Sequence, residues 1–230
     1  MKNIIAIIPA REGSKGVPLK NMALVNKKPL IDWTIDAALH SKYISAIVVS
    51  SDSDVILNHV KQNDNVICIE RPSNLAKDDT PTEPVIIHAL EQLEDREFDI
   101  VLLLQPTSPL RTSEDIDNAY EAFIKSEATA LISVTAPKYH PLKSFKKNDE
   151  GYLEGLVNDK FPFMPRQELP EVYQPNGAVY IIYKKDFLES HKLITNSTIP
   201  FMMSLENSID IDTLDDIKMV ERLLKKNINE

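Results

Sequence analysis

The chain has 230 residues, of which 43% are hydrophobic and 27% are charged, as is usual for a globular protein with one sizeable core. Its 35 acidic residues outnumber its 26 lysines and arginines, and the resulting net charge of −9 argues against general binding to nucleic acids or anionic membranes. An anionic ligand would need a local basic pocket. The first 30 positions supply one, because they hold six lysines and arginines beside a single acid, Glu12.

The first predicted elements are a strand and a loop near the start of the chain. Ile4–Ile8 is a continuous apolar run, which predicts a strand buried on both faces, as in a parallel sheet. Gly13 and Gly16 follow, and they allow backbone amides to approach an anion closely. The same loop carries Ser14 and three cations, Arg11, Lys15 and Lys20. A strand followed by such a loop is suited to the phosphates of a nucleotide.

The spacing of this loop excludes two common phosphate-binding motifs. There is no G-x-x-x-x-G-K-[ST], which argues against a Walker-type ATPase, and no G-x-G-x-x-G, which argues against a dinucleotide-binding dehydrogenase. A polar surface turn is the alternative for the two glycines alone. Three cations on one turn of an acidic protein favour the anion site.

Strands and helices are predicted to alternate as far as residue 135. Apolar runs indicate strands over 46–50, 66–69, 99–104 and 129–135, and apolar residues at helical spacing indicate helices between them. Thr112 and Asp115 have the spacing of a capping box. Ser51–Asp54 is expected to cap the helix that ends at Val60, with contact to a ligand as the alternative. Such alternation predicts an α/β domain with a doubly wound, mostly parallel sheet.

Residues 137–175 interrupt this pattern with frequent prolines, short periodicity and a cluster of lysines. We expect a small β-rich arm here, inserted in a domain formed by 1–136 and 176–230. Because such an arm often packs against another subunit, we also expect a homodimer. The sheet is predicted to resume at 177–183 and to gain a last strand at 200–204, before a closing helix.

Four groups of polar residues are candidates for a functional site. Asp210 and Asp212 alternate, so their carboxylates point to one side of an extended segment and suit Mg²⁺, with capping of the last helix as the alternative. Gln105 to Arg111 directly follow a strand, where α/β folds place ligands. Arg166-Gln167 could clamp a carboxylate, and Asn176-Gly177 could be a turn.

The single cysteine, Cys68, lies in an apolar run and is expected to be a buried thiol without a disulfide. Neither a signal peptide nor an apolar segment of transmembrane length is evident. The expected compartment is therefore the cytoplasm, and neither a membrane nor a nucleic acid is expected as a partner.

Several segments, in order, carry a resemblance that covers nearly the whole chain. They are Pro9-Ala10-Arg11-Glu12-Gly13-Ser14-Lys15-Gly16, Arg71-Pro72, Leu104-Gln105-Pro106-Thr107-Ser108-Pro109-Leu110-Arg111, His140-Pro141-Leu142-Lys143, Arg166-Gln167, Pro175-Asn176-Gly177-Ala178 and Asp210-x-Asp212-Thr213. Together they resemble the bacterial CMP-N-acylneuraminate (CMP-sialic acid or CMP-nonulosonate) synthetases.

The resemblance implies a nucleotide-diphospho-sugar transferase-like fold and a Mg²⁺-dependent cytidylyltransferase. Its substrates would be CTP and a nine-carbon 2-keto sugar acid, whose anomeric hydroxyl attacks the α-phosphate to give the CMP-sugar and pyrophosphate. By position, the implied nucleotide-binding residues are Arg11, Ser14, Lys15, Lys20, Asn21, Arg71 and Asp78. The implied sugar-binding residues are Gln105, Lys143 (from the partner subunit), Arg166, Gln167, Asn176 and Tyr180. Asp210 and Asp212 would bind metal, and Arg11, Lys20 and Asp212 would be catalytic.

Two alternatives remain open from the sequence. A CMP-Kdo-type or another sugar cytidylyltransferase would share the first loop in outline, but the Arg166-Gln167 and Asn176-Gly177-Ala178 segments fit it poorly. A non-catalytic sensor of nucleotide or sugar would not need the pair of aspartates. Family members that use N-acetylneuraminate can carry two aromatics where this chain has His191-Lys192-Leu193-Ile194, which makes a diacetylated legionaminic acid a candidate sugar.

Overall fold

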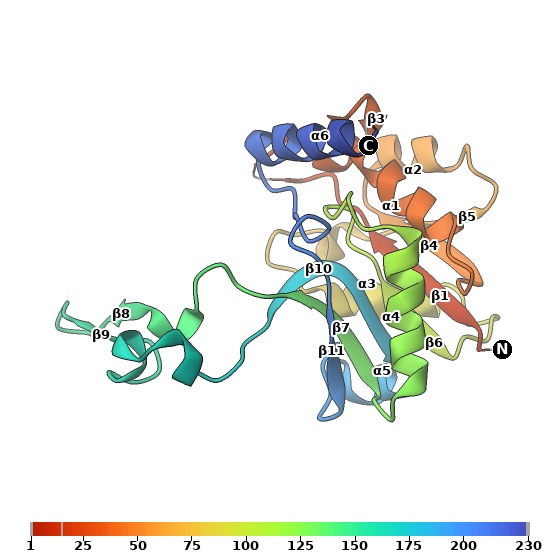
Figure 1. The fold of residues 1–230 in the computed structure, drawn as a ribbon. Coiled ribbons are helices and arrows are strands. Elements are labelled where there is room, and N and C mark those ends of the chain that lie inside the picture. Colours follow the sequence, from red (N-terminus) through yellow and green to blue (C-terminus); the bar gives the residue numbers. More distant parts are fainter. Residues whose placement is uncertain (1, 15, 229–230) are drawn as a thin grey trace.

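The computed structural model describes residues 2–14 and 16–228, with side chains as far as 226. A seven-stranded sheet with the order β11-β7-β10-β6-β1-β4-β5 forms its centre (Figure 1). Strand β10 is antiparallel to β6 and β7, and the other pairings of this sheet are parallel. The strands are β1 (Ile4–Pro9), β4 (Ala46–Ser51), β5 (Val66–Glu70), β6 (Ile100–Leu103), β7 (Ala130–Thr135), β10 (Gln174–Tyr183) and β11 (Thr198–Met202).

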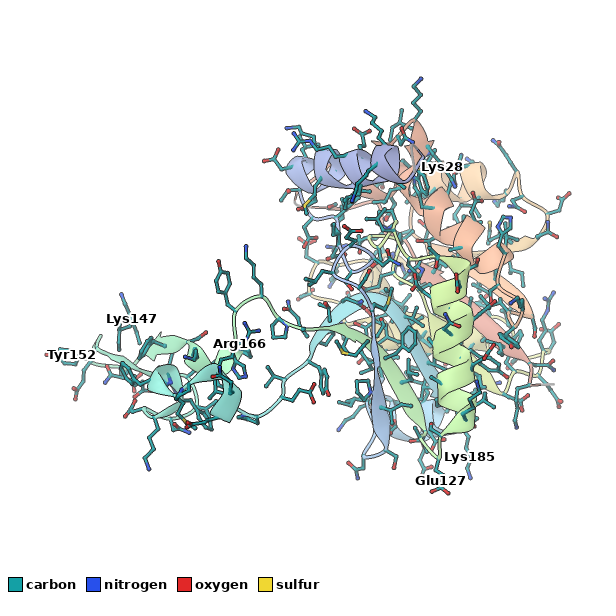
Figure 2. All side chains as sticks on the ribbon, in the orientation of Figure 1. Lys28, Glu127, Lys147, Tyr152, Arg166 and Lys185 are labelled. Atoms are coloured by element: carbon teal, nitrogen blue, oxygen red, sulfur yellow. The ribbon has the colours of Figure 1, made fainter. Side chains whose placement is uncertain are left out.

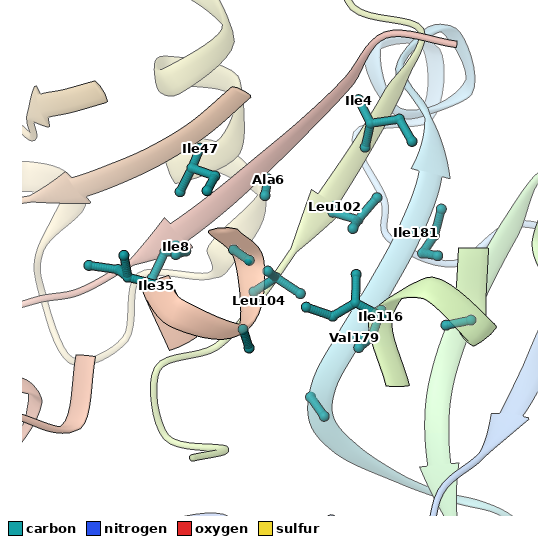
Figure 3. Close-up of a cluster of buried hydrophobic side chains, with 14 of the residues drawn as sticks. Ile4, Ala6, Ile8, Ile35, Ile47, Leu102, Leu104, Ile116, Val179 and Ile181 are labelled. Atoms are coloured by element: carbon teal, nitrogen blue, oxygen red, sulfur yellow. The ribbon is translucent and has the colours of Figure 1, made fainter. Parts of the chain in front are cut away.

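Helices cover both faces of the sheet, as β1 illustrates. Ile4, Ala6 and Ile8 point toward α1, α2 and α4, whereas Ile5 and Ile7 point toward α3 and α5. All five side chains are at most 1% exposed, which confirms the predicted strand buried on both faces. Figure 3 shows the first of these two clusters. The helices are α1 (Leu30–Leu39), α2 (Asp54–Val60), α3 (Thr82–Glu91), α4 (Ser113–Lys125) and α5 (Lys184–Ser190).

Helix α6 (Leu214–Ile228) packs outside these layers, on the loop that follows β1. Its residues Ile217 and Val220 form a third buried cluster with Val17 of that loop and with Ile211, just before the helix. The short strands β2 (Leu24–Val25) and β3 (Lys28–Pro29) form a hairpin beside it. This cluster joins the first loop of the chain to its last segment, which are far apart in sequence.

Besides the hairpin of β2 and β3, three elements differ from the sequence prediction by more than one residue at an end. Helix α5 is not predicted, because only Phe187 of its residues is buried and no apolar periodicity marks it. Strand β10 begins at Gln174 rather than 177, and β11 covers Thr198–Met202 rather than 200–204. Each contains a proline, which weakens the strand signal in the sequence. Both prolines are tolerated, since Pro175 lies beyond the pairing of β10 with β6 and Pro200 lies on an edge strand.

An arm leaves the sheet after β7 and returns to it at β10 (Figure 1). It holds the antiparallel pair β8 (Phe145–Lys147) and β9 (Leu153–Gly155), with 3-10 turns around them. Figure 2 shows Lys147, Tyr152 and Arg166 on this arm, away from the main body. Several of its large apolar side chains are exposed, among them Tyr139, Tyr152, Leu153, Val157 and Phe163.

Cys68 lies on the edge strand β5 and is half-buried rather than fully buried, because no further strand covers that edge. Partial removal of water raises the pKa of its thiol. None of the described helices has the length and hydropathy that a membrane crossing requires.

Candidate functional site

A cavity of about 330 Å³ opens where β1, β5 and β6 end. Its walls come from the loops that follow these strands, from the start of α3 and from the segment before α6. These loops follow the carboxyl ends of parallel strands, as is usual for ligand sites in α/β sheets. The walls include nine of the residues proposed from the sequence, namely Arg11, Ser14, Lys20, Asn21, Arg71, Asp78, Gln105, Asp210 and Asp212.

The loop after β1 is held in shape by its own polar contacts. The side-chain amide of Asn21 donates to the carbonyl of Arg11 at 2.9 Å, closing the loop on itself. Leu19 has a φ of 47°, a left-handed conformation that turns the chain before Lys20. Gly16 lies directly against the carbonyl of Asp212, where a β-carbon would approach the oxygen closer than 3.0 Å. A glycine is therefore required at this position by packing.

Arg71 links the first loop to the neighbouring strand ends. It is 5% exposed, and its Nη2 donates to Asp52 Oδ1 at 3.3 Å, the same oxygen that accepts the N–H of Glu12 at 3.1 Å. Burial lowers the pKa of Arg71, and its hydrogen bond to Asp52 opposes that shift. The expected capping of α2 by 51–54 is wrong, because Ser53 makes no side-chain cap and the Asp52 carboxylate is used to fasten the loop.

Two ion pairs cross the cavity walls. Arg11 Nη1 lies 2.6 Å from Asp78 Oδ1, which joins the loop after β1 to the loop after β5. Lys20 Nζ lies 2.9 Å from Asp212 Oδ1 and donates to the carbonyl of Ile211 at 2.8 Å. The Lys20 side chain is 14% exposed, whereas that of Asp212 is 72% exposed. A cation of the first loop is thus held against the carboxylate that faces the open cavity.

The capping contacts of α6 are made by Thr213 and Asp216. Thr213 donates from its N–H and its hydroxyl to Asp216 Oδ2, both at 2.7 Å, and Asp216 N–H donates back to Thr213 Oγ1 at 3.3 Å. This reciprocal pair does not use the carboxylate of Asp212. The side chains of Asp210 and Asp212 both line the cavity.

Asp210 has an unusual electrostatic environment. Removal of water by the surrounding protein raises its pKa, and the nearby Asp212 raises it further, while a hydrogen bond from Thr107 and the charge of Lys20 oppose the shift. The segment is anchored beside it, because Ile211 N–H donates to the carbonyl of Thr107 at 2.8 Å. Two carboxylates close together favour the binding of a cation at this point.

Arg111, at the end of the Gln105–Arg111 run, is a structural residue. It is 2% exposed and donates to the carbonyls of Gln105 at 3.1 Å and Ala178 at 2.8 Å, and to Thr34 Oγ1 at 2.6 Å. Burial lowers its pKa to about 9. The guanidinium thus fixes the backbone of Gln105 relative to β10. The sequence motif marks this residue, but only the structure shows that it faces inward.

The Gln105 side chain rests on Gly177, which has a φ of 75°. A β-carbon at Gly177 would lie closer than 3.0 Å to Gln105 Oε1. Asn176 is buried beside it and outside the cavity wall. Tyr180 is also outside that wall, and burial and the charge of Asp210 raise its pKa.

The remaining proposed residues lie elsewhere. Lys143, Arg166 and Gln167 are exposed on the arm and are not among the residues that line this cavity. Lys15 lies outside the described residues. Two lining residues, Thr80 and Thr82, are missing from the sequence proposals, although they come just before and at the start of α3, where helix amides favour anions.

The donor set at Asp210 and Asp212 fits a hard divalent cation such as Mg²⁺. Within the described residues no group of three or more His, Cys, Asp or Glu side chains could hold a metal ion on its own. Magnesium is commonly held by one or two carboxylates together with substrate phosphates. The two aspartates therefore fit a metal that is shared with a phosphate-bearing ligand, and the adjacent cations Arg11 and Lys20 fit the phosphates themselves.

Comparisons with known proteins show which proteins the chain is similar to. A family model described as "Cytidylyltransferase" matches residues 5–223. The N-acylneuraminate cytidylyltransferase of Streptococcus agalactiae serotype V is 36% identical over 92% of this chain and 51% of its own length. The CMP-N,N'-diacetyllegionaminic acid synthase of Legionella pneumophila is 36% identical over 97% of each chain.

The fold also matches solved structures. A CMP:2-keto-3-deoxy-manno-octonic acid synthetase, solved in complex with CTP, superposes with a TM-score of 0.71 over 98% of this chain and 99% of its own. The sequence identity is 16%, so this likeness concerns the fold alone. Among the curated relatives, the chain spans about half the length of the streptococcal protein.

Proposed function

The chain belongs to the cytidylyltransferase family, and from this premise we propose that it joins CTP to a nine-carbon 2-keto sugar acid, giving the CMP-sugar and pyrophosphate. One observation carries the proposal. The cavity brings the cations of the loop after β1 against the paired carboxylates of Asp210 and Asp212. That combination suits a triphosphate and its metal ion, which a simple sugar-binding protein would not require.

The nucleotide would lie along the loop that follows β1. Arg11, Lys20 and the hydroxyl of Ser14 line the cavity and can bind phosphate oxygens, and Asn21 keeps the loop closed through the Arg11 carbonyl. Arg71 and Asp78 also line the cavity and would border the cytidine. Lys15 belongs to the same loop in sequence and is proposed as a further phosphate ligand.

The reaction forms a bond between the anomeric oxygen of the sugar and the α-phosphorus, and it breaks the bond from that phosphorus to the oxygen that leaves with pyrophosphate. Arg11 and Lys20 would neutralise the charge that gathers on the phosphate oxygens, which is how such sites accelerate attack. Asp210 and Asp212 would hold Mg²⁺, which when bound would neutralise phosphate charge and favour loss of the hydroxyl proton to solvent. No His or Glu is found among the described residues that line the cavity, so we assign no separate base.

The sugar acid would lie between Gln105 and basic residues supplied by the arm. Tyr180 would lie near it on the side of Gln105. Lys143, Arg166 and Gln167 are exposed on an arm that also exposes large apolar side chains, an arrangement suited to packing against a second copy of the chain. We therefore propose a homodimer in which the arm of one subunit brings these residues to the cavity of the other. The negative charge of the sugar carboxylate fits the cations Lys143 and Arg166.

The identity of the sugar is proposed more narrowly from residues 191–194. Two of the relatives are each 36% identical to this chain. By their names, one acts on N-acylneuraminate and the other makes CMP-N,N'-diacetyllegionaminic acid. His191-Lys192-Leu193-Ile194 offers no aromatic pair, and we propose a diacetylated legionaminic acid ahead of N-acetylneuraminate. A CMP-Kdo-type activity is the second candidate, which the shared fold alone favours.

Pyrophosphate release with CTP and Mg²⁺ tests the proposal across N-acetylneuraminate, diacetyllegionaminate, pseudaminate and Kdo. Release with a nonulosonate supports it, and release with Kdo alone supports the second candidate. If the folded protein binds CTP but releases no pyrophosphate with any of these sugars, the result would indicate a sensor. Asp212→Ala is the matched control, because it should abolish release while the protein stays folded.

A further inference from the structure

The geometry assigns Asn176 a positioning role, and this inference rests on the proposed function. We infer that its side chain holds the segment that carries Asp210 and Asp212 in place, and that it does not contact the sugar acid. The family resemblance implies a sugar contact for this residue. The surroundings of its side chain point instead to the metal-binding segment.

Asn176 lies at an interruption of the sheet. The pairing of β10 with β7 shifts there, so that residues 176–179 face the single residue Ser133. The backbone amides released from the ladder are bound by side chains instead. Ala178 N–H donates to Asn176 Oδ1 at 3.2 Å, and Val179 N–H donates to Ser133 Oγ at 2.7 Å. The Asn176 side chain thus completes the bulge.

The hydrogen-bonding capacity of the Asn176 amide is fully used. Its Oδ1 accepts from the hydroxyl of Ser133 at 2.6 Å and from the N–H of Ala178. Its Nδ2 donates to Ser208 Oγ at 2.8 Å and to Met203 Sδ at 3.4 Å. A carboxamide offers two donors and two acceptor positions, and the residue is 6% exposed. Neither a donor nor an acceptor remains for a sugar hydroxyl.

The contact with Ser208 is the one that reaches the proposed metal site. Ser208 lies two residues before Asp210, and its hydroxyl donates to the carbonyl of Ser204 at 2.6 Å, closing a turn. Beyond Asp210, the N–H of Ile211 is held by the carbonyl of Thr107. The segment is therefore fastened on both sides of Asp210. Asn176, through Ser208, provides the first of these two attachments from the rigid central sheet.

Removal of this attachment should loosen the carboxylates without altering the sugar pocket. Asn176→Ala is the direct variant, but it leaves the O–H of Ser133 and the N–H of Ala178 without acceptors in the core and is expected to reduce stability. Ser208→Ala is milder, because Ser208 is only partly buried and does not line the cavity. Ser208→Thr keeps the hydroxyl and is the matched control.

The test is the affinity for Mn²⁺ in the presence of CTP, followed by the relaxation rate of water protons, together with the KM for the sugar acid. Ser208→Ala should weaken Mn²⁺ binding about tenfold, as loss of an outer-shell partner does. Its KM for the sugar acid should stay unchanged, and Ser208→Thr should match the wild type in both. The Mn²⁺ measurement needs no turnover.

An unchanged Mn²⁺ affinity in Ser208→Ala would overturn the inference. A raised KM for the sugar acid in Ser208→Ala, with Mn²⁺ binding intact, would also overturn it, because that result would indicate that Asn176 contributes to sugar binding. A wild type that binds Mn²⁺ with CTP but transfers nucleotide to no sugar acid would refute the proposed function alone. In that case the Mn²⁺ titration of the two variants still decides the role of Asn176.

Discussion

Lys20 and Asp212 lie 192 residues apart in the sequence, yet Lys20 Nζ is 2.9 Å from Asp212 Oδ1. The same ammonium group donates to the backbone carbonyl of Ile211 at 2.8 Å. One side chain of the loop after β1 therefore holds the segment before α6 at two points. This contact joins the two parts of the chain that we propose bind the triphosphate and its metal ion.

Replacement of Lys20 tests this junction. Lys20→Met removes the cation that neutralises Asp212 and, in the proposed reaction, a phosphate ligand. We expect kcat/KM for CTP to fall roughly 100- to 1,000-fold, the usual cost of removing one group that stabilises transition-state charge. Lys185→Met is the control, since Lys185 is exposed near the start of α5 (Figure 2) and is not among the residues that line the cavity. Equal activity of the two variants would contradict the role of Lys20.

Gly16 and Gly13 lie in the same loop, so alanine substitutions at the two positions can be compared. An added methyl group at Gly16 would collide with the carbonyl of Asp212, whereas Gly13 has no neighbouring atom within 4 Å. Gly16→Ala should therefore displace the loop and cost about 1–3 kcal/mol of stability, with a Tm lower by roughly 2–10 °C. Gly13→Ala should leave Tm unchanged. Similar Tm values for both variants would show that the close approach of Gly16 is unimportant.

Gly177 and Gly151 allow the position of Gln105 to be tested separately from backbone strain. Both glycines have positive φ, 75° and 90°, so alanine meets a similar backbone penalty at each. Only at Gly177 would the methyl group push away the Gln105 side chain. Gly177→Ala should raise KM for the sugar acid roughly tenfold, as expected for a lost polar contact. If the two variants have the same KM for the sugar acid, Gln105 does not contribute to sugar binding.

Asp216 gives the stability of the α6 cap a defined pH dependence. Burial alone would raise its pKa, but hydrogen bonds from Thr213 and the N–H of Asp212 outweigh it and lower the pKa below the ordinary 3.8. Its stabilisation is therefore present above that value and is lost as the pH falls through the lower folded pKa. Asp216→Ala should lower Tm at pH 7, by the cost of about 1 kcal/mol for a lost cap.

Thermal unfolding across a pH series measures this effect. The difference in Tm between wild type and Asp216→Ala should be constant near neutrality and should shrink below the ordinary pKa of an aspartate, where the unfolded chain binds the proton first. A difference that grows on acidification would be the wrong sign and would rule out the cap as its source.

The proposed dimer depends on the apolar surface of the arm. The rings of Phe145 and Phe163 meet edge to face at 6.0 Å, and Phe163 is 79% exposed. Phe163→Asp should convert a dimer to a monomer in light scattering and should abolish transfer, because the basic residues of the arm would no longer reach a second cavity. Leu24→Asp, at an exposed position of the main body, is the control. A fully active monomer would refute the shared site.

Much of the fold is predictable from local sequence signals. The continuous apolar run of β1 and the Thr112–Asp115 capping box are both found as expected, because strand burial and helix capping are decided by neighbouring residues. Helix α5 is not predictable in this way, since it buries a single apolar side chain. The irregular pairing of β10 is likewise set by side chains of β7 and of the turn before α6.

The candidate site likewise contains residues whose positions can be predicted from the sequence and residues whose roles cannot. Loops that follow parallel strands meet at one edge, so Arg11, Gln105 and Asp210 are predictable as neighbours from the sequence. The roles of Asp52 and Arg111 cannot be predicted from the sequence, because each depends on backbone atoms of distant segments. Both polar side chains face inward and are used to hold the walls of the cavity. The sequence alone does not distinguish such supporting residues from ligands.

Phosphorus NMR of the reaction of CTP with diacetyllegionaminate or N-acetylneuraminate follows the fate of each phosphate. If the chain transfers the nucleotide to the sugar acid, the α-phosphorus of CTP moves into a single phosphodiester resonance, with an equal amount of pyrophosphate, and neither product forms with Asp212→Ala. Formation of CDP and inorganic phosphate, or unchanged CTP with every nonulosonate, would contradict transfer of the nucleotide to a sugar acid.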